Sequence, residues 1–266
     1  MRSLKTQLDI VLILFLFPRM QILSPHHVAN LTALKALIEK PELHETSIRI
    51  PLGPNEVDLC LRGGLQRGVL HEVFAVPGHE TAATGFMAGL ASRISGAKQT
   101  LWIRPDFSAH EFGEISATGL CELGHNPSRF LLFYATNADD ALRVANDALS
   151  CAALGAVIIE MIGNPKIFDL VASRRLTLAA SQKSVTAIFL RFSAKPNTST
   201  AETRWLVRAA PSPKRSEDWG YPAFEANLVR NRHGKTGQWF MEWNCDECVF
   251  QNTKADCGAM VSASTN

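Results

Sequence analysis

The chain lacks several features that would place it in a special class of protein. Six cysteines in 266 residues are too few and too scattered for a disulfide scaffold. Such sparse cysteine favours a reducing compartment, and we therefore expect a cytoplasmic protein. The formal net charge of +2 is too small to indicate a nucleic-acid partner by itself. With 46% hydrophobic and 20% charged residues, the composition is that of a globular protein rather than a disordered one.

A long apolar run is also missing. The run at residues 10–17 has eight apolar residues, whereas a bilayer-spanning helix needs about 20. Arg2 and Lys5 precede it, as in a signal peptide, but no small-residue cleavage site follows. We prefer the interpretation that translation starts at Met20. Residues 1–27 are then a hydrophobic, disordered extension, and we expect no membrane association.

No lysine occurs between Gln66 and Ser95, although this stretch has the pattern of a phosphate-binding loop. Residues 69–76 resemble a strand, 77–80 a tight turn and 81–94 a helix rich in small residues. A nucleotide-binding P-loop would read G-x-x-x-x-G-K-[ST], with the lysine reaching the β- and γ-phosphates. The sequence therefore predicts a nucleotide-binding scaffold that has lost its nucleotide, with no cofactor.

A carboxylate stands where the phosphate would lie. Glu80 is expected at the N-terminus of the helix, where it stabilises the helix dipole and repels a triphosphate. The predicted degenerate phosphate loop consists of Pro77, Gly78, His79, Glu80 and Thr81.

Strand-like and helix-like segments alternate along the rest of the chain. Beyond a helix at 28–40, the patterns predict strands at 99–104, 129–134, 155–161 and 185–190, and helices at 110–118, 138–153 and 167–182. The strands at 129–134 and 155–161 both look buried. This alternation predicts an α/β fold with a mostly parallel central sheet covered by helices on both faces. Ligands of such folds bind at the carboxyl ends of the strands.

The last part of the chain changes character. Strands are predicted at 204–208, 226–232 and 238–243, and the last two form an antiparallel hairpin that closes one edge of the sheet. One domain at residues 28–250 and a disordered tail at 251–266 complete the predicted organisation.

Two acidic residues follow apolar strands and are candidates for nucleotide chemistry. Glu160 ends the run at 156–159, where a nucleotide hydrolase keeps a carboxylate for Mg²⁺. A strand-end carboxylate bonded to a neighbouring loop is the favoured interpretation, which makes Glu160 a vestigial residue. Asp106 is either a water-activating base or a helix cap, and we favour the cap.

Four other patterns resemble functional motifs, but we interpret each of them as structural. Gly234-Lys235-Thr236 has the closing letters of a P-loop but precedes a strand, so we interpret it as a hairpin turn. Cys245 and Cys248 have metal-like spacing, yet with Cys257 they supply three ligands at best, and we expect no metal site. The histidines stand at no catalytic motif spacing, so we expect no catalytic residue. Three tryptophans are interpreted as core residues rather than base-stacking platforms: Trp205, Trp239 and Trp243.

Positive charge is concentrated near the C-terminus. Residues 191–235 contain nine Lys and Arg against four Asp and Glu, a balance of +5. A solvated surface is the simpler interpretation, and a DNA-facing or partner-facing edge is the alternative. The candidate contact residues are Arg204, Arg208, Arg230, Arg232 and Lys235.

Taken in order, these motifs resemble the RecA-like ATPase fold and, more narrowly, the ImuA family of DNA-damage-inducible mutagenesis proteins. The glycines at 63, 64 and 68 with the strand that follows resemble the lead-in and first core strand of RecA. The run at 156–160 is similar to its second acidic strand. Residues 229–243 resemble the closing hairpin of ImuA proteins and are the most specific piece.

The resemblance implies a role without supplying a reaction. It implies an accessory protein of SOS-induced translesion synthesis that contacts an ImuB-like polymerase relative and an error-prone polymerase, with RecA and DNA as further candidate partners. The ATP-binding roles of RecA transfer to no residue here, because the loop at 77–84 has no Gly-Lys-Thr.

Two alternatives stay open at this stage. One is a divergent ATPase that uses Glu160 with a cation from Lys98, Arg104 or an arginine of a neighbouring subunit. The other is a single-stranded DNA-binding protein that uses the five basic residues named above.

Overall fold

The strand predicted at residues 69–76 forms the middle of the molecule. In the computed structural model, which describes residues 48–213 and 220–253, this strand is β3 (Leu70–Ala75). It lies fifth in a nine-stranded sheet of order β11-β10-β9-β8-β3-β7-β6-β4-β5. All six of its residues are buried. Parallel neighbours on both sides explain why its sequence is a nearly continuous apolar run.

Six strands of the sheet run parallel. Besides β3 they are β4 (Gln99–Pro105), β5 (Phe130–Ala135), β6 (Leu154–Ile162), β7 (Thr186–Phe192) and β8 (Thr203–Ala209). Three antiparallel strands extend it beyond β8: β9 (Ala223–Asn231), β10 (Gly237–Asn244) and β11 (Val249–Asn252). The predicted hairpin is therefore confirmed as β9 and β10, but β11 rather than the hairpin forms the edge of the sheet.

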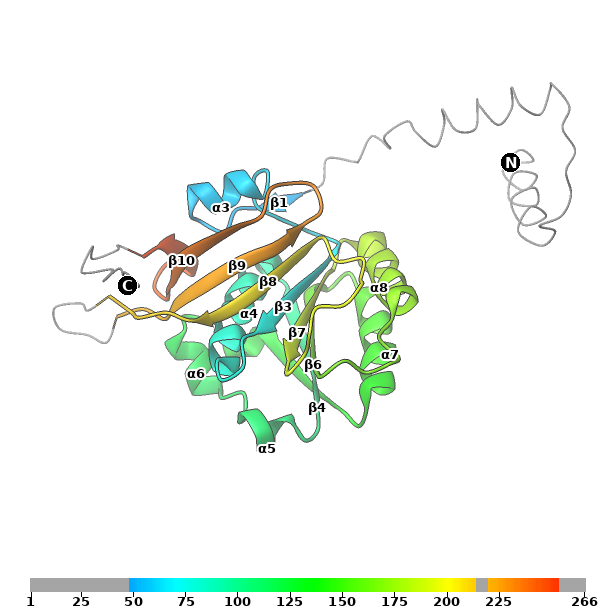
Figure 1. Cartoon of the computed structure of the whole chain (residues 1–266). Coiled ribbons are helices and arrows are strands. Elements are labelled where there is room, and N and C mark those ends of the chain that lie inside the picture. The colour runs from blue at the N-terminus through cyan, green and yellow to red at the C-terminus, as the bar shows by residue number, and fades with distance from the viewer. Residues whose placement is uncertain (1–47, 214–219, 254–266) are drawn as a thin grey trace, which may run out of the picture. The chain divides into compact units, whose positions relative to one another are not determined.

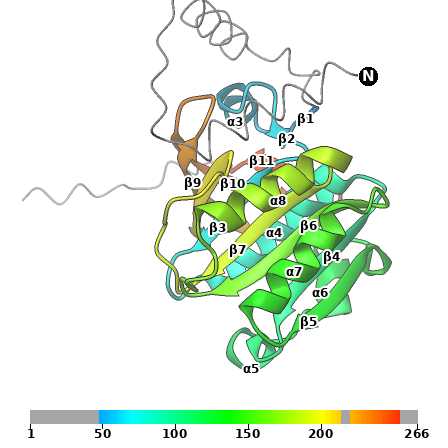
Figure 2. The same cartoon turned by 90° about the vertical axis from the view of Figure 1, so that its right-hand side faces the viewer.

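Helices cover both faces of the parallel part. Helix α4 (Glu80–Ser95) packs on one face, and α7 (Ala138–Leu149) and α8 (Leu170–Lys183) pack on the other. Figure 1 shows α4 behind the sheet, and Figure 2 shows α7 and α8 side by side in front of it. The predicted fold class, a mostly parallel sheet between two helical layers with a C-terminal hairpin, is confirmed.

Close approach of α4 to the C-terminal strands explains its content of small residues. A Cβ atom at Gly89 would lie 2.8 Å from Phe250 and 2.9 Å from Trp243. Trp205 and Trp243 are 0% and 1% exposed in this layer, which confirms them as core residues, and Trp239 is partly buried against them.

Several shorter elements complete the described chain. They are β1 (Arg49–Ile50), β2 (Leu65–Gln66), α3 (Asn55–Cys60), α5 (Ser108–Phe112), α6 (Ala117–Glu122) and the 3₁₀ turn η1 (Pro127–Arg129). No pattern predicted α3 or β11. The single helix predicted at 110–118 is wrong, because Gly113 takes a positive φ of 80° and separates α5 from α6.

The burial predicted for residues 129–134 is also wrong. This segment is β5, at the edge of the sheet, and Leu131, Leu132 and Tyr134 are 47%, 38% and 44% exposed. An apolar run shows that a segment suits a strand, but strand order decides whether both of its faces are covered.

Some predictions concern residues outside the described part. The helix at 28–40, the extension at 1–27 and most of the tail lie there, and the domain limits stay a prediction. Across residues 48–213 and 220–253 no helix has the length and apolar character to cross a membrane.

Candidate functional site

The turn between β3 and α4 is too short to wrap a phosphate. Four residues, 76–79, separate the end of β3 from the start of α4. The Val76 amide donates to the Val207 carbonyl at 3.0 Å, and the His79 amide donates back to the Val76 carbonyl at 2.9 Å. A P-loop needs six residues from its first to its second glycine before the lysine. The turn therefore joins strand to helix directly and is shorter than a P-loop.

The Glu80 carboxylate accepts the hydrogen bond of a backbone amide that a phosphate would otherwise accept. Its Oε1 accepts a hydrogen bond from the Gly78 amide at 3.2 Å, and Gly78 has a positive φ of 84°. His79 Nδ1 accepts from the Ala209 amide at 3.3 Å and ties the turn to the end of β8. Pro77 and Thr81 are exposed on either side. The local negative charge opposes an anion at this helix N-terminus.

Glu160 lies within β6, two residues before the strand ends, and is 1% exposed. Its carboxylate accepts hydrogen bonds from Ser108 Oγ at 2.5 Å and from Trp102 Nε1 at 3.2 Å. The Arg104 guanidinium completes the cluster as an ion pair at 3.3 Å. Both carboxylate oxygens are thus bonded within the protein, and the partners lie on β4 and on helix α5 rather than on the neighbouring loop that the sequence predicted.

The space beside Glu160 is small. A cavity of about 80 Å³ at the carboxyl ends of β4 and β6 is lined by Phe107, Asn137, Glu160 and Met161, among others. Ligand pockets are typically about 300–1,000 Å³. The cap predicted at Asp106 is wrong, because Phe107 occupies the N-cap position of α5 and that position makes no side-chain capping bond.

A second buried ion pair lies on the other face of the sheet and was not expected. Arg204 Nε donates to Glu72 Oε2 at 2.6 Å, and Glu72 is 0% exposed. Arg191 lies nearby, with its guanidinium 5.3 Å from the Phe74 ring centre and Nη2 bonded to Asn164 at 2.6 Å. Burial lowers the pKa of Arg191 to about 10. A glutamate inside the apolar β3 run was the only sequence signal of this pair.

The five candidate basic residues are not brought together as one patch. Arg204 is buried against Glu72, and Arg230 donates to the Ser199 carbonyl at 3.1 Å. Arg208 is exposed and pairs with Glu225 at 2.5 Å. Arg232 and Lys235 are exposed in the β9–β10 connection. The geometry does not favour Arg204 as a contact residue, and contact by any of the five stays a prediction.

The turn at Gly234-Lys235-Thr236 connects antiparallel β9 and β10, as predicted. The Lys235 carbonyl accepts from Asn231 Nδ2 at 3.0 Å and from Cys60 Sγ at 2.9 Å. These contacts seat the turn on the end of α3.

The cysteine pair has structural contacts. Cys248 Sγ donates to the Gly124 carbonyl at 3.1 Å, which links the β10–β11 turn to the loop after α6. Among the described residues, no group of three or more His, Cys, Asp or Glu side chains could hold a metal ion. Cys257 lies outside them.

Comparisons with known proteins give two kinds of relative. The chain is 29% identical to Protein ImuA of Caulobacter vibrioides strain NA1000 / CB15N, over 73% of this chain and 82% of that protein. The same figures hold for Protein ImuA of strain ATCC 19089 / CIP 103742 / CB 15. No protein-family model matches the chain.

A solved structure shares the fold. The crystal structure of the RadB recombinase superposes with a TM-score of 0.53 and 16% sequence identity, and the match covers 77% of this chain and 100% of that one. At that identity the likeness concerns the fold alone, which is RecA-like.

Proposed function

Because this chain belongs to the ImuA family, we propose that it is a non-catalytic accessory protein of SOS-induced, error-prone translesion DNA synthesis. It acts in the cytoplasm through protein contacts with an ImuB-like polymerase relative and an error-prone polymerase. RecA and DNA are further candidate partners. It binds no nucleotide cofactor in this role.

The turn between β3 and α4 is the observation that carries the non-catalytic part of the proposal. Its four residues leave no room for a phosphate wrap, and the Glu80 carboxylate already accepts the Gly78 amide at 3.2 Å. A phosphate there would displace that carboxylate and face its negative charge. The buried Glu160 is held by Arg104 and Ser108, which supports a structural use of its charge.

The open face of the C-terminal strands is the surface we propose for partner contact. In Figure 1 no helix of the described residues lies in front of the near face of β8, β9 and β10. Phe240 is 52% exposed on this face, beside the exposed ion pair of Arg208 and Glu225. Exposed aromatic and arginine side chains are typical anchors of protein interfaces. Arg232 and Lys235 add positive charge at the end of the same strands.

A capture experiment tests the contact with the ImuB-like protein. Tagged full-length protein is recovered from ultraviolet-treated cells, and the co-purified ImuB-like protein is quantified by immunoblot. We expect Phe240→Asp and the double change Arg232→Glu/Lys235→Glu to reduce recovery at least about fivefold. The matched control is Lys183→Glu at the far end of α8. Equal recovery with all variants would contradict this surface.

Single-stranded DNA binding is the second candidate, because Arg232 and Lys235 are exposed and make no ion pair within the described residues. Phosphate contacts predict an affinity that falls steeply with salt. Failure to bind an oligonucleotide at low salt would remove this candidate. In a divergent ATPase, Glu160 would have to be released from its buried ion pair with Arg104, and a cation would have to be supplied for the phosphates.

A further inference from the structure

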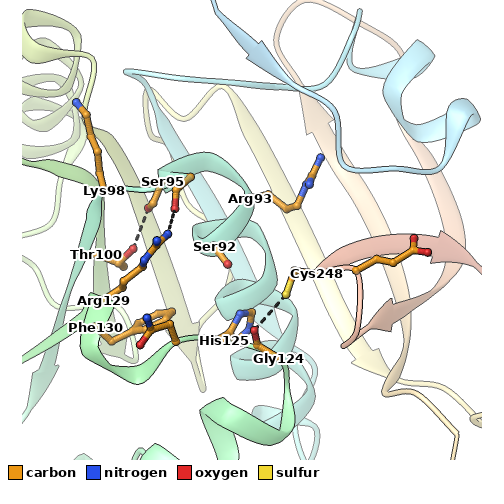
Figure 3. Close-up of a pocket in the computed structure, with 13 residues that line it drawn as sticks. Ser92, Arg93, Ser95, Lys98, Thr100, Gly124, His125, Arg129, Phe130 and Cys248 are labelled. Carbon is orange, nitrogen blue, oxygen red and sulfur yellow. Dashed lines mark hydrogen bonds between the residues drawn. The ribbon is translucent and has the colours of Figure 1, made fainter.

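A pocket lies at the amino-terminal ends of the parallel strands, on the opposite side of the sheet from their carboxyl ends. It has a volume of about 310 Å³ and lies where β4 and β5 begin. Its walls come from the last turns of α4, the first residues of β4 and β5, the loop after α6 and the β10–β11 turn (Figure 3). This pocket is therefore separate from the vestigial nucleotide site.

Three cations line the pocket: Arg93, Lys98 and Arg129. Each is held by a backbone carbonyl and pairs with no carboxylate among the described residues: Arg93 donates to Pro51 at 2.7 Å, Lys98 to Ala152 at 2.9 Å and Arg129 to Gly96 at 2.9 Å. An arginine has five N–H donors, so Arg129 keeps donors for a ligand. Glu247 is the one carboxylate in the lining, which leaves a charge of 3 − 1 = +2.

His125 also lines the pocket and has free hydrogen-bonding capacity. It is 4% exposed, and neither ring nitrogen has a partner among the described residues. Its ring lies 5.8 Å from that of Phe130 and 5.2 Å from that of Trp243. Burial lowers its pKa to about 4, so the neutral ring offers one donor and one acceptor. Buried polar groups in folded proteins are normally paired.

Backbone contacts hold His125 in place, and its ring nitrogens take no part in them. The His125 amide donates to the Leu120 carbonyl at 2.8 Å, and Trp243 Nε1 donates to the Leu123 carbonyl at 2.8 Å. A Cβ atom at Gly124, whose φ is 76°, would lie 1.9 Å from the Cys245 carbonyl oxygen. Glycine thus lets the loop touch the C-terminal hairpin. The wall that carries His125 is a close-packed part of the structure.

We propose that this pocket binds a phosphorylated small molecule of about mononucleotide size. The phosphate bonds to Arg129, and a polar ring or hydroxyl group of the ligand bonds to His125. Figure 3 shows the Arg93 and Lys98 head groups on opposite sides of Arg129, directed away from the pocket, so these two cations attract the anion through their charge alone. Guanidinium and ammonium donors suit phosphate oxygens. The Phe130 ring supplies an apolar surface for a flat ligand. A volume of about 310 Å³ suits a small organic phosphate rather than a bare ion. The C-terminal end of α4 carries partial negative charge, which would oppose an anion. Arg129 donates a hydrogen bond to the Gly96 carbonyl there and offsets part of that charge.

Calorimetry with the full chain at low salt tests the proposal. The probes are deoxyadenosine 5′-monophosphate, deoxyadenosine and inorganic phosphate. We expect the monophosphate to bind saturably and each of the other two to bind at least about tenfold more weakly, since each lacks one set of contacts. Arg129→Gln, at an exposed position, weakens the monophosphate about tenfold, and Lys98→Gln weakens it less than Arg129→Gln does. The control Arg174→Gln, exposed on α8, changes its affinity less than twofold.

His125→Phe keeps the ring stack and removes both nitrogens. It should weaken the monophosphate and leave inorganic phosphate unchanged, and the ring signals of His125 in the unmodified protein should shift when the monophosphate is added. Absence of saturable binding at millimolar monophosphate would overturn the proposal. So would equal weakening by Arg174→Gln, or inorganic phosphate that binds as tightly as the monophosphate.

Discussion

Arg104 on β4 and Glu160 on β6 form an ion pair at 3.3 Å, with side chains only 2% and 1% exposed. They stand side by side because β4 and β6 pair in parallel, with Ile103 opposite Ile159. The acid that a nucleotide hydrolase would direct at Mg²⁺ is thus compensated inside the protein.

Removing one partner of this pair should destabilise the fold. Glu160→Ala leaves the Arg104 charge buried without its partner, and we expect the free energy of unfolding to fall by about 3–5 kcal/mol. Urea denaturation measures the change. The control is Asp140→Ala, which breaks the exposed pair with Arg143 and should change stability by less than about 1 kcal/mol. Equal effects of the two substitutions would contradict a structural role of the buried pair.

A lysine placed at the P-loop position should not restore nucleotide binding. Ala82→Gly/Ala83→Lys creates the Gly-Lys-Thr sequence with Thr84, but Ala83 is 0% exposed within α4. The new lysine would be buried in the helix, so we expect no ATP binding by calorimetry and a loss of about 2 kcal/mol or more of stability. Thr81→Lys, at an exposed position, is the stability control. Saturable ATP binding by the double variant would show that the short turn is not the limiting feature.

Two glycines in α4 should respond oppositely to alanine. At Gly89 the added methyl group would meet Phe250 at 2.8 Å and Trp243 at 2.9 Å, so we expect a loss of about 1–3 kcal/mol. At Gly85 the nearest atoms belong to Phe224 at 3.7 Å, an ordinary contact. Alanine there should stabilise the helix by about 0.5–1 kcal/mol. Thermal unfolding distinguishes the two, and a stabilised Gly89→Ala variant would contradict the close contact of α4 with the C-terminal strands.

Acid should weaken the fold through His71. This side chain is fully buried, its Nε2 bonds to the Gln66 carbonyl at 2.8 Å and its Nδ1 to Thr203 Oγ1 at 2.7 Å. Burial lowers its pKa from 6.5 to about 4. As the pH falls, the histidine of the unfolded chain is protonated before that of the folded chain. The contribution of neutral His71 to the free energy of unfolding is therefore fully present above pH 6.5. It is lost as the pH drops towards 4, by about 3 kcal/mol.

Unfolding measured across this pH range tests the role of His71. His71→Gln should flatten the dependence. His125 contributes in the same direction, since burial also lowers its pKa to about 4. A His71→Gln variant with the full pH dependence would show that other groups cause it.

Local sequence patterns were enough to predict the central strand, the turn after it and the hairpin. Each depends on neighbouring residues: an apolar run with turn residues at its end, or two strand patterns joined by a short polar turn. The missing lysine was equally visible, because a P-loop has a fixed spacing.

Features that depend on strand order could not be predicted. Glu72 and Arg204 are 132 residues apart in sequence and meet only because β3 and β8 are neighbours. Arg204 and Arg208 looked equivalent, yet the first is covered and the second is exposed. Burial of β5 likewise depended on its place at the edge. The pocket around His125 combines three separate segments of the chain, so no local pattern indicated it.

The frequency of ultraviolet-induced mutants tests the central claim most directly. It is measured in cells that carry the intact gene, a deletion, or Glu160→Gln, which keeps the shape of the side chain and removes its charge. The account predicts that deletion lowers induced mutagenesis while growth without damage is retained, and that Glu160→Gln, present at the normal protein level, supports it fully. Unchanged mutagenesis after deletion, or a Glu160→Gln strain as deficient as the deletion at normal protein level, would contradict a non-catalytic accessory role.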